Sequence, residues 1–92
     1  MAETRTKTSK DQDPMFLSLI LSLAQAALVC LGKMKGQNGD IKVDLDQASL
    51  NIGMIRVLKE KTQNNLTKDE AKSLSSTLKD LEVHYTDEAN KN

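Results

Sequence analysis

Aromatic side chains are scarce in this sequence: Phe16 and Tyr85 are the only ones, and tryptophan is absent. A hydrophobic core must therefore be packed from leucine, isoleucine, valine, methionine and alanine. The sequence has 92 residues, a length that allows one domain at most and makes a single core marginal. We therefore expect one small domain with an aliphatic core.

Net charge is also lacking. Thirteen lysines and arginines balance thirteen aspartates and glutamates, and no segment concentrates basic residues. Non-specific binding to nucleic acid or to anionic lipid depends on such an excess of positive charge. We therefore predict no nucleic-acid partner.

Cysteine and histidine occur once each, as Cys30 and His84. One cysteine cannot form an internal disulfide, and these two side chains alone cannot make a zinc site. No glycine-rich loop follows a strand pattern, so a phosphate-binding loop has no support. We therefore expect no catalytic, cofactor-binding or metal-binding residue. The protein is predicted not to be an enzyme, to need no cofactor and to reside in the reducing cytoplasm.

The most prominent feature that is present is an uncharged, mostly apolar stretch at residues 14–32, PMFLSLILSLAQAALVCLG. Asp13 suits the N-cap position, Pro14 the first helical turn, and Gly32 a left-handed C-cap. The stretch therefore predicts a helix over about residues 14–31.

This helix has three interpretations: a membrane span, a cleaved export signal, or the inner helix of a soluble assembly. Residues 15–31 would be about 25 Å long, at the lower limit of a transmembrane span. An export signal is disfavoured because the residues before Pro14 carry as many acidic as basic side chains. A span would expose Ser18, Ser22 and Gln25 to lipid and would deprive the rest of the chain of its apolar partner. We therefore favour the soluble assembly.

Two further helices are predicted, over about residues 45–62 and 68–85. The sequences DLDQ and TKDE, which start at Asp44 and Thr67, have the spacing of capping boxes. In the break between the helices, Asn65 is expected to adopt the left-handed conformation. One apolar stripe on the last helix is made by Ala71, Leu74, Leu78, Leu81 and Tyr85. The middle helix has one apolar side, Leu45, Ala48, Ile52 and Ile55, and a further apolar arc, Leu50, Met54, Val57 and Leu58.

The two ends of the chain are polar. Residues 1–12, MAETRTKTSKDQ, mix both signs of charge and are predicted to be a disordered tail. Residues 13–86 are predicted to form a single helical domain, and residues 87–92 a frayed C-terminus. The predicted fold class is therefore all-α, with three helices.

One copy of such a domain would leave apolar surface uncovered, since the helix at 14–31 has almost no polar side. Four small residues spaced four apart on this helix would let two helix backbones come close: Ser18, Ser22, Ala26 and Cys30. We predict that this row is the interface of a homodimer or higher oligomer, packed as a helical bundle. The alternative is that the row seats the helix at 68–85.

Polar side chains concentrate only at EKTQNNLT, residues 60–67. A possible recognition surface for a peptide or protein consists of Glu60, Lys61, Thr62 and Asn65. The alternative, which we favour, is that these residues end one helix and begin the next.

Several strings of this sequence resemble the DUF1844 family of small bacterial proteins: SLAQAAL, Leu31-Gly32, DLDQA and EKTQNNLTKDE. The resemblance covers residues 16–85, with Asn64 where the family usually has glycine. It implies a bacterial origin and supports the three-helix layout. The family has no assigned function, so the resemblance implies no site residues.

The predicted function is that of a self-associating protein-interaction module, which binds itself and an unidentified protein partner. The alternative is a membrane-associated accessory protein anchored by residues 15–31, in which case the membrane would be a further partner.

Overall fold

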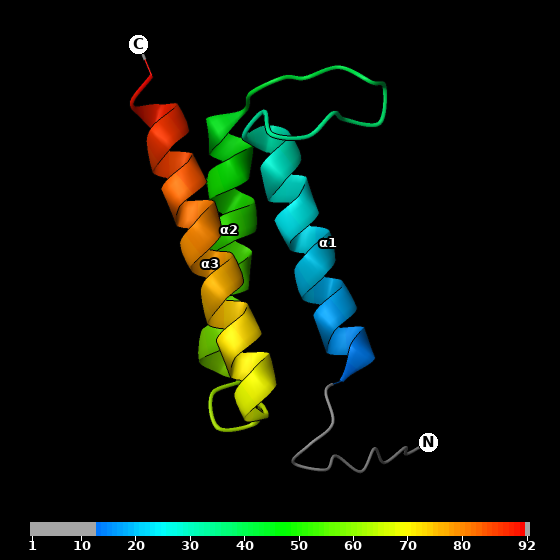
Figure 1. The fold of residues 1–92 in the computed structure, drawn as a ribbon, viewed down its shortest axis with the longest axis vertical. Coiled ribbons are helices and arrows are strands. Elements are labelled where there is room, and N and C mark those ends of the chain that lie inside the picture. Colours follow the sequence, from blue (N-terminus) through cyan, green and yellow to red (C-terminus); the bar gives the residue numbers. More distant parts are fainter. Residues whose placement is uncertain (1–12, 92) are drawn as a thin grey trace.

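The computed structural model describes residues 13–91, which form three helices and contain no strand. Helix α1 spans Pro14–Cys30, α2 spans Leu45–Lys61 and α3 spans Lys68–Ala89 (Figure 1). The predicted all-α, three-helix fold is thus confirmed. The predicted tail, residues 1–12, lies outside the described residues. The packing of the domain into a homo-oligomer stays a prediction.

Helix α1 begins and ends at the residues that suit its caps. The Asp13 carboxylate accepts hydrogen bonds from the backbone N–H groups of Met15 and Phe16, at 3.0 and 3.3 Å, and Pro14 is the first helical residue. At the other end, Gly32 has a φ of +77°, the left-handed conformation predicted for it. Both ends of α1 are therefore set by neighbouring residues in the sequence.

Helix α2 also has the predicted start, because the Asp44 carboxylate accepts a hydrogen bond from the N–H of Gln47 at 3.0 Å. The turn that follows α2 differs from the prediction. Its left-handed residue is Asn64, with a φ of +73°, so the prediction for Asn65 is wrong. The N–H of Asn65 instead donates to the carbonyl oxygen of Thr62 at 2.9 Å. The turn closed by this hydrogen bond therefore has its left-handed residue one position earlier than predicted.

Helix α3 is longer than predicted. The sequence pattern predicts its end near residue 85 and a frayed segment over 87–92, but the helix continues to Ala89. The Glu88 side chain is 14% exposed, and its carboxylate pairs with the Lys91 ammonium group at 3.2 Å. Burial of one side of the last turn, together with this ion pair, supports helix over residues 87–89. The predicted helix end near residue 85 is therefore wrong, and the fraying of the C-terminus stays a prediction.

Helix α2 packs against both other helices, whereas α1 and α3 touch each other least (Figure 1). The core is aliphatic, as expected, and both aromatic side chains, Phe16 and Tyr85, pack at its margin. Its buried members are Ile20, Ala24, Ala27, Leu31, Ala48, Ile52, Ile55, Leu74, Leu78 and Leu81. The predicted apolar stripe of α3 faces this core, with the exception of the exposed Ala71.

Gly53 lies in the middle of α2, where glycine is less favourable than any residue except proline. A Cβ atom added there would meet no neighbouring heavy atom within 4 Å. We therefore expect Gly53→Ala to raise the free energy of unfolding by about 1 kcal/mol, and Gly53→Ser by about half as much. Urea unfolding followed by circular dichroism measures both changes. A loss of stability in Gly53→Ala would contradict the prediction.

Candidate functional site

The row of small residues predicted as an oligomer interface lies mainly on the outward side of α1. Ser18 and Ser22 are exposed, and Ala26 and Cys30 are half-buried. The α1 residues that line the groove beside α3 are others: Phe16, Leu17, Ile20, Leu21 and Ala24. The alternative interpretation, in which the row seats the third helix, is therefore wrong. The interface itself stays a prediction.

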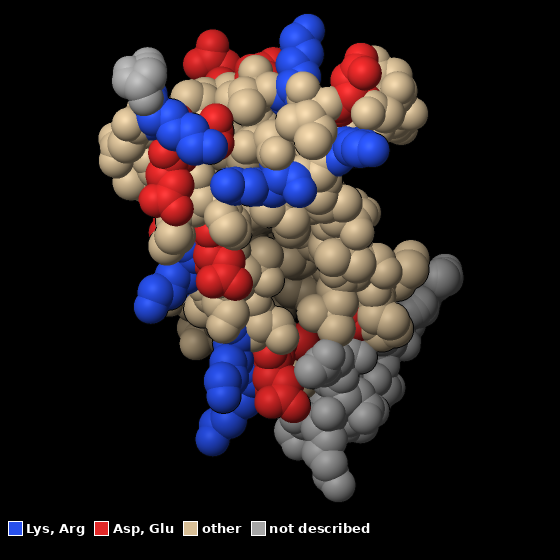
Figure 2. All heavy atoms as spheres, turned by 45° about the horizontal axis from the view of Figure 1, so that its top comes forward, with Lys and Arg blue, Asp and Glu red and all other residues tan. Residues whose placement is uncertain are grey.

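Large apolar side chains are exposed on both α1 and α2. Met15 and Leu19 on α1 are 80% and 47% exposed, and Leu50, Met54 and Val57 on α2 are 60%, 44% and 50% exposed. Figure 2 shows that charged side chains gather over α3 and the loop after α1, while the visible surface of α1 carries none. We use the term uncharged face for the outward residues Met15, Leu19, Ser22, Ala26, Leu50, Met54 and Val57.

The last member of the row, Cys30, turns toward α2. Its sulfur lies 4.0 Å from the side-chain nitrogen of Asn51, which is 5% exposed. Burial, and after it the Asp44 carboxylate, raises the pKa of the Cys30 thiol above its usual value. The thiol is therefore protonated at neutral pH and is not an activated nucleophile. The sequence pattern does not predict a buried polar residue at Asn51, although its spacing from Ala48 and Ile55 indicates the core side.

We expect Cys30 to react with iodoacetamide more slowly in the folded protein than in the unfolded chain, because only the thiolate reacts and the pKa is raised by folding. The folded state thus holds the thiol proton more tightly. This contribution to stability is complete below the unfolded pKa and is lost as pH rises through the folded pKa. Alkylation rates between about pH 7 and pH 10, measured by mass spectrometry, check the prediction.

The matched variant for that experiment is Asp44→Asn. Asparagine caps a helix about as well as aspartate, but it removes the negative charge that helps to raise the pKa of Cys30. The variant should therefore be alkylated faster than the wild-type protein. Equal rates in the folded protein and in urea would contradict the prediction.

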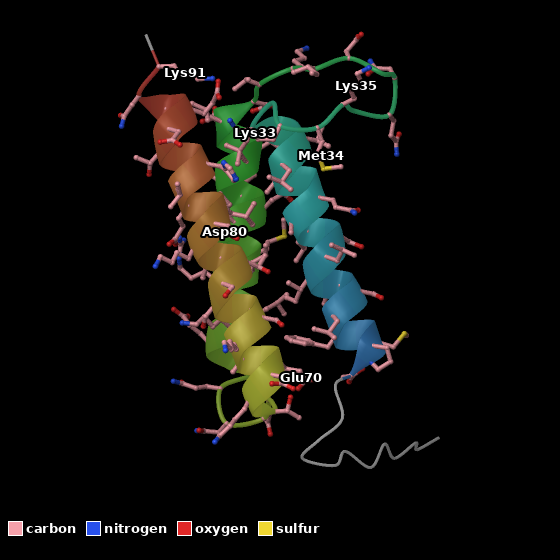
Figure 3. All side chains as sticks on the ribbon, viewed as in Figure 1. Lys33, Met34, Lys35, Glu70, Asp80 and Lys91 are labelled. Atoms are coloured by element: carbon pink, nitrogen blue, oxygen red, sulfur yellow. The ribbon has the colours of Figure 1, made fainter. Side chains whose placement is uncertain are left out.

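A second buried polar side chain, Glu70, joins the N-termini of α1 and α3 (Figure 3). Its Oε1 accepts a hydrogen bond from the N–H of Thr67 at 2.9 Å, and the Thr67 hydroxyl oxygen accepts one from the N–H of Glu70 at 3.1 Å. The predicted capping box is thus confirmed. The Oε2 atom of Glu70 accepts a hydrogen bond from the N–H of Asp13, the N-cap of α1. These two residues are 57 positions apart, so no local pattern could have indicated this contact.

Two members of the predicted recognition surface form hydrogen bonds at the end of α2. The Thr62 hydroxyl donates a hydrogen bond to the carbonyl oxygen of Leu58 at 2.6 Å, and the Thr62 carbonyl accepts one from Asn65. Thr62 and Asn65 therefore end α2 and form the turn, which agrees with the capping interpretation. Glu60 and Lys61 are exposed, and Glu60 lines a groove between α2 and α3.

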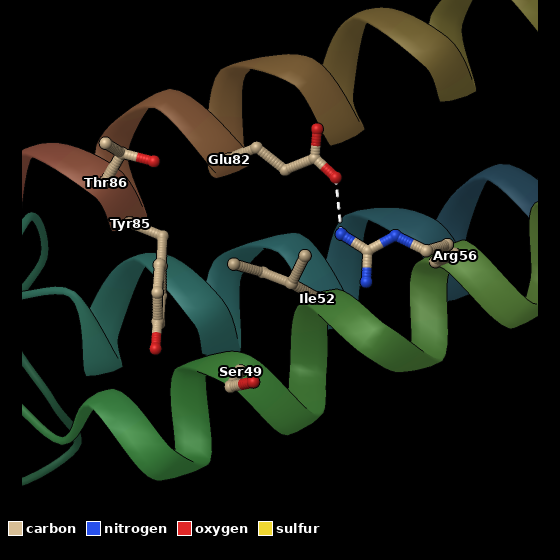
Figure 4. Close-up of a pocket in the computed structure, with 6 residues that line it drawn as sticks. All are labelled: Ser49, Ile52, Arg56, Glu82, Tyr85 and Thr86. Carbon is tan, nitrogen blue, oxygen red and sulfur yellow. Dashed lines mark hydrogen bonds and ion pairs between the residues drawn. The ribbon is translucent and has the colours of Figure 1, made fainter. Parts of the chain in front are cut away.

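That groove has a volume of about 660 Å³. Its lining combines apolar side chains, such as Leu66 and Leu78, with charged ones, such as Lys59 and Lys68. Beside it lies a smaller hollow of about 400 Å³, where Arg56 and Glu82 form an ion pair (Figure 4). Both partners are about half exposed, so the pair contributes little to stability.

Two further structural findings concern a metal site and a membrane span. Within residues 13–91, no group of three or more histidine, cysteine, aspartate or glutamate side chains is placed to hold a metal ion. Among the helices that the structure describes, none is long and apolar enough to cross a membrane.

Together these features define a small all-α protein of three helices with an uncharged outward face. Residues 13–87 match the family described as "Domain of unknown function (DUF1844)", and the chain belongs to this family. The resemblance noted in the sequence is thereby confirmed. No curated protein and no solved structure matches the chain.

Proposed function

We propose that this DUF1844 protein is a self-associating module whose copies bind one another through the outward side of α1, and that the assembly holds another protein. The observation that carries the proposal is the composition of that side. Met15 and Leu19 are exposed, Ser18 and Ser22 are small and exposed, and residues 14–32 contain no charge. Large exposed apolar patches mark interaction sites in proteins.

The free energy gained by burying the exposed apolar side chains of α1 supports self-association. Complete burial of a leucine or methionine side chain is worth about 1.5–3 kcal/mol. Covering the half-exposed side chains of α1 therefore offers several kcal/mol, which is large beside the about 5–15 kcal/mol that keeps a domain folded. The small side chains of Ser18, Ser22 and Ala26 allow a second helix to approach closely.

A binding role toward a second protein is supported by the groove between α2 and α3, which has apolar walls and the exposed Glu60 at its rim. The proposed role is thus binding rather than catalysis. We place it in the cytoplasm, because a single unpaired cysteine suits a reducing compartment.

Sedimentation analysis of the purified protein, without detergent, tests the self-association. We expect a dimer or a higher symmetric oligomer at micromolar concentration. Ser22→Leu and Ala26→Leu should weaken association and lower the melting temperature, because they insert bulk where the helices approach. Ser22→Glu should weaken association as well, since it would bury a charge. Ser22 is exposed in the single chain, so its variants should still fold.

The control is Arg56→Ala, which removes an exposed ion pair worth less than about 1 kcal/mol. It should leave both association and melting temperature unchanged. A wild-type protein that is folded and monomeric at these concentrations would contradict the proposal.

A further inference from the structure

The contact between Cys30 and Asn51 marks the seam where α1 and α2 meet. Along α1, Ala26 and Leu19 precede Cys30 by four and eleven residues, and positions with this spacing share one side of a helix. Along α2, Met54 follows Asn51 by three residues and therefore lies beside the same seam. Exposed side chains of the two helices thus border one another.

The residues that face α3 show that this border lies on the opposite side. On α1, Leu17 and Leu21 line the groove beside α3, and they lie away from Leu19 around the helix. On α2, three of its charged residues line the groove with α3: Arg56, Lys59 and Glu60. The other two, Asp46 and Lys61, lie near the ends of α2. The middle of its outward side is apolar, with Leu50, Met54 and Val57 spaced by four and three residues.

We infer that a second copy of this chain docks on α1 and α2 together, so that these helices of two copies form a four-helix core and α3 stays outside. This inference rests on the proposed self-association and adds the residues of α2 to the interface. Each of the two helices has 17 residues. Side by side they present a surface about 25 Å long and about 20 Å wide, about 500 Å² in each copy.

The buried area indicates whether α1 alone or α1 and α2 together form the interface. Two such surfaces bury about 1,000 Å² in total, which is the lower limit for a specific interface. A contact through α1 alone would bury about half as much and would resemble a chance contact. Because the same face occurs on both copies, the arrangement is a two-fold dimer. It leaves the groove between α2 and α3 open to another protein.

The competing place for a second copy is the groove between α1 and α3, which has a volume of about 260 Å³. Its lining is mostly apolar, with Ser73 and Thr77 as polar members on α3, but charged side chains lie along the exposed surface of α3 (Figure 2). A copy docked there would also approach these charged side chains of α3, and their desolvation would oppose binding. The uncharged face includes the polar Ser22, but it has no charged side chain that would have to be desolvated.

Four glutamate substitutions distinguish docking on the α1–α2 face from docking in the groove between α1 and α3. Leu50→Glu and Met54→Glu alter the proposed interface, Leu21→Glu alters the competing groove, and Val83→Glu alters the outer surface of α3. All four side chains are at least 44% exposed in the single chain, so the variants should fold. By sedimentation equilibrium, we expect the dimer dissociation constant to rise at least about tenfold for the first two and to change less than about twofold for the others.

Maleimide labelling gives a second measurement that does not depend on folding stability. In a Cys30→Ala background, Met54→Cys should be labelled more slowly in concentrated than in dilute protein, and Val83→Cys equally at both concentrations. If the wild-type chain dimerises, but Met54→Glu does so equally well and Leu21→Glu does not, the inference is wrong and self-association stands. A wild-type chain that stays monomeric overturns both.

Discussion

Glu70→Ala is expected to lower the free energy of unfolding by about 3–5 kcal/mol, a large part of the about 5–15 kcal/mol that holds a domain folded. The Glu70 side chain is fully buried and accepts hydrogen bonds from the N–H groups of Thr67 and Asp13. Leaving a buried hydrogen-bonding group without its partner costs about 1–3 kcal/mol. The substitution removes this acceptor from the N–H groups of the N-cap residues of two helices, α1 and α3.

Urea unfolding measures the loss. Glu70→Gln keeps one acceptor oxygen and should lose about half as much. The control is Glu82→Gln, which alters an exposed ion pair with Arg56 and should lose less than about 1 kcal/mol. Hydrogen exchange in Glu70→Ala should rise in the first turn of α1, because Asp13 caps that helix. Wild-type stability in Glu70→Ala would show that the link between α1 and α3 does not hold the fold together.

Gly32→Ala is expected to lower the free energy of unfolding by about 2 kcal/mol, for two separate reasons. Gly32 has a φ of +77°, a left-handed conformation that raises the free energy of a residue with a side chain by about 1–2 kcal/mol. In addition, the new Cβ would lie 2.9 Å from Cγ2 of Val43, so the Val43 side chain or the loop that carries it would have to shift.

Two comparison variants separate these contributions. Gly39 has a φ of +84°, but a Cβ there would meet nothing within 4 Å, so Gly39→Ala should lose only about 1 kcal/mol. Val43→Ala, combined with Gly32→Ala, should recover the part that comes from the close approach. Thermal unfolding of the wild type, the two single glycine variants and the double variant measures the contribution of the left-handed backbone and that of the close approach. Equal losses for Gly32→Ala and Gly39→Ala would mean that Val43 moves aside freely.

The helix starts could be predicted from sequence because capping acts over three residues or fewer. Asp13, Asp44 and Thr67 each accept a hydrogen bond from an N–H group in the first turn that follows. The burial of Asn51 and the bond from Asp13 to Glu70 join segments that are distant in the chain. They depend on how the helices pack, which no local pattern encodes.

The composition of the proposed interaction surface was predictable to a similar extent. The lack of charge over residues 14–32 and the row of small residues are visible in the sequence, and so are the two apolar sides of α2. Which of those sides meets the core is settled by packing, since Ile52 and Ile55 are buried whereas Leu50 and Met54 are exposed. Only the folded arrangement brings the outward side of α2 next to Leu19.

The position of α2 between α1 and α3 also affects how the chain folds. Most contacts join helices that follow one another in the sequence, and proteins built from such local contacts fold in microseconds to milliseconds. Incompletely folded chains aggregate through exposed apolar segments, and α1 is such a segment. Rapid pairing with α2, the next helix to leave the ribosome, shortens the time during which α1 can stick to unrelated chains.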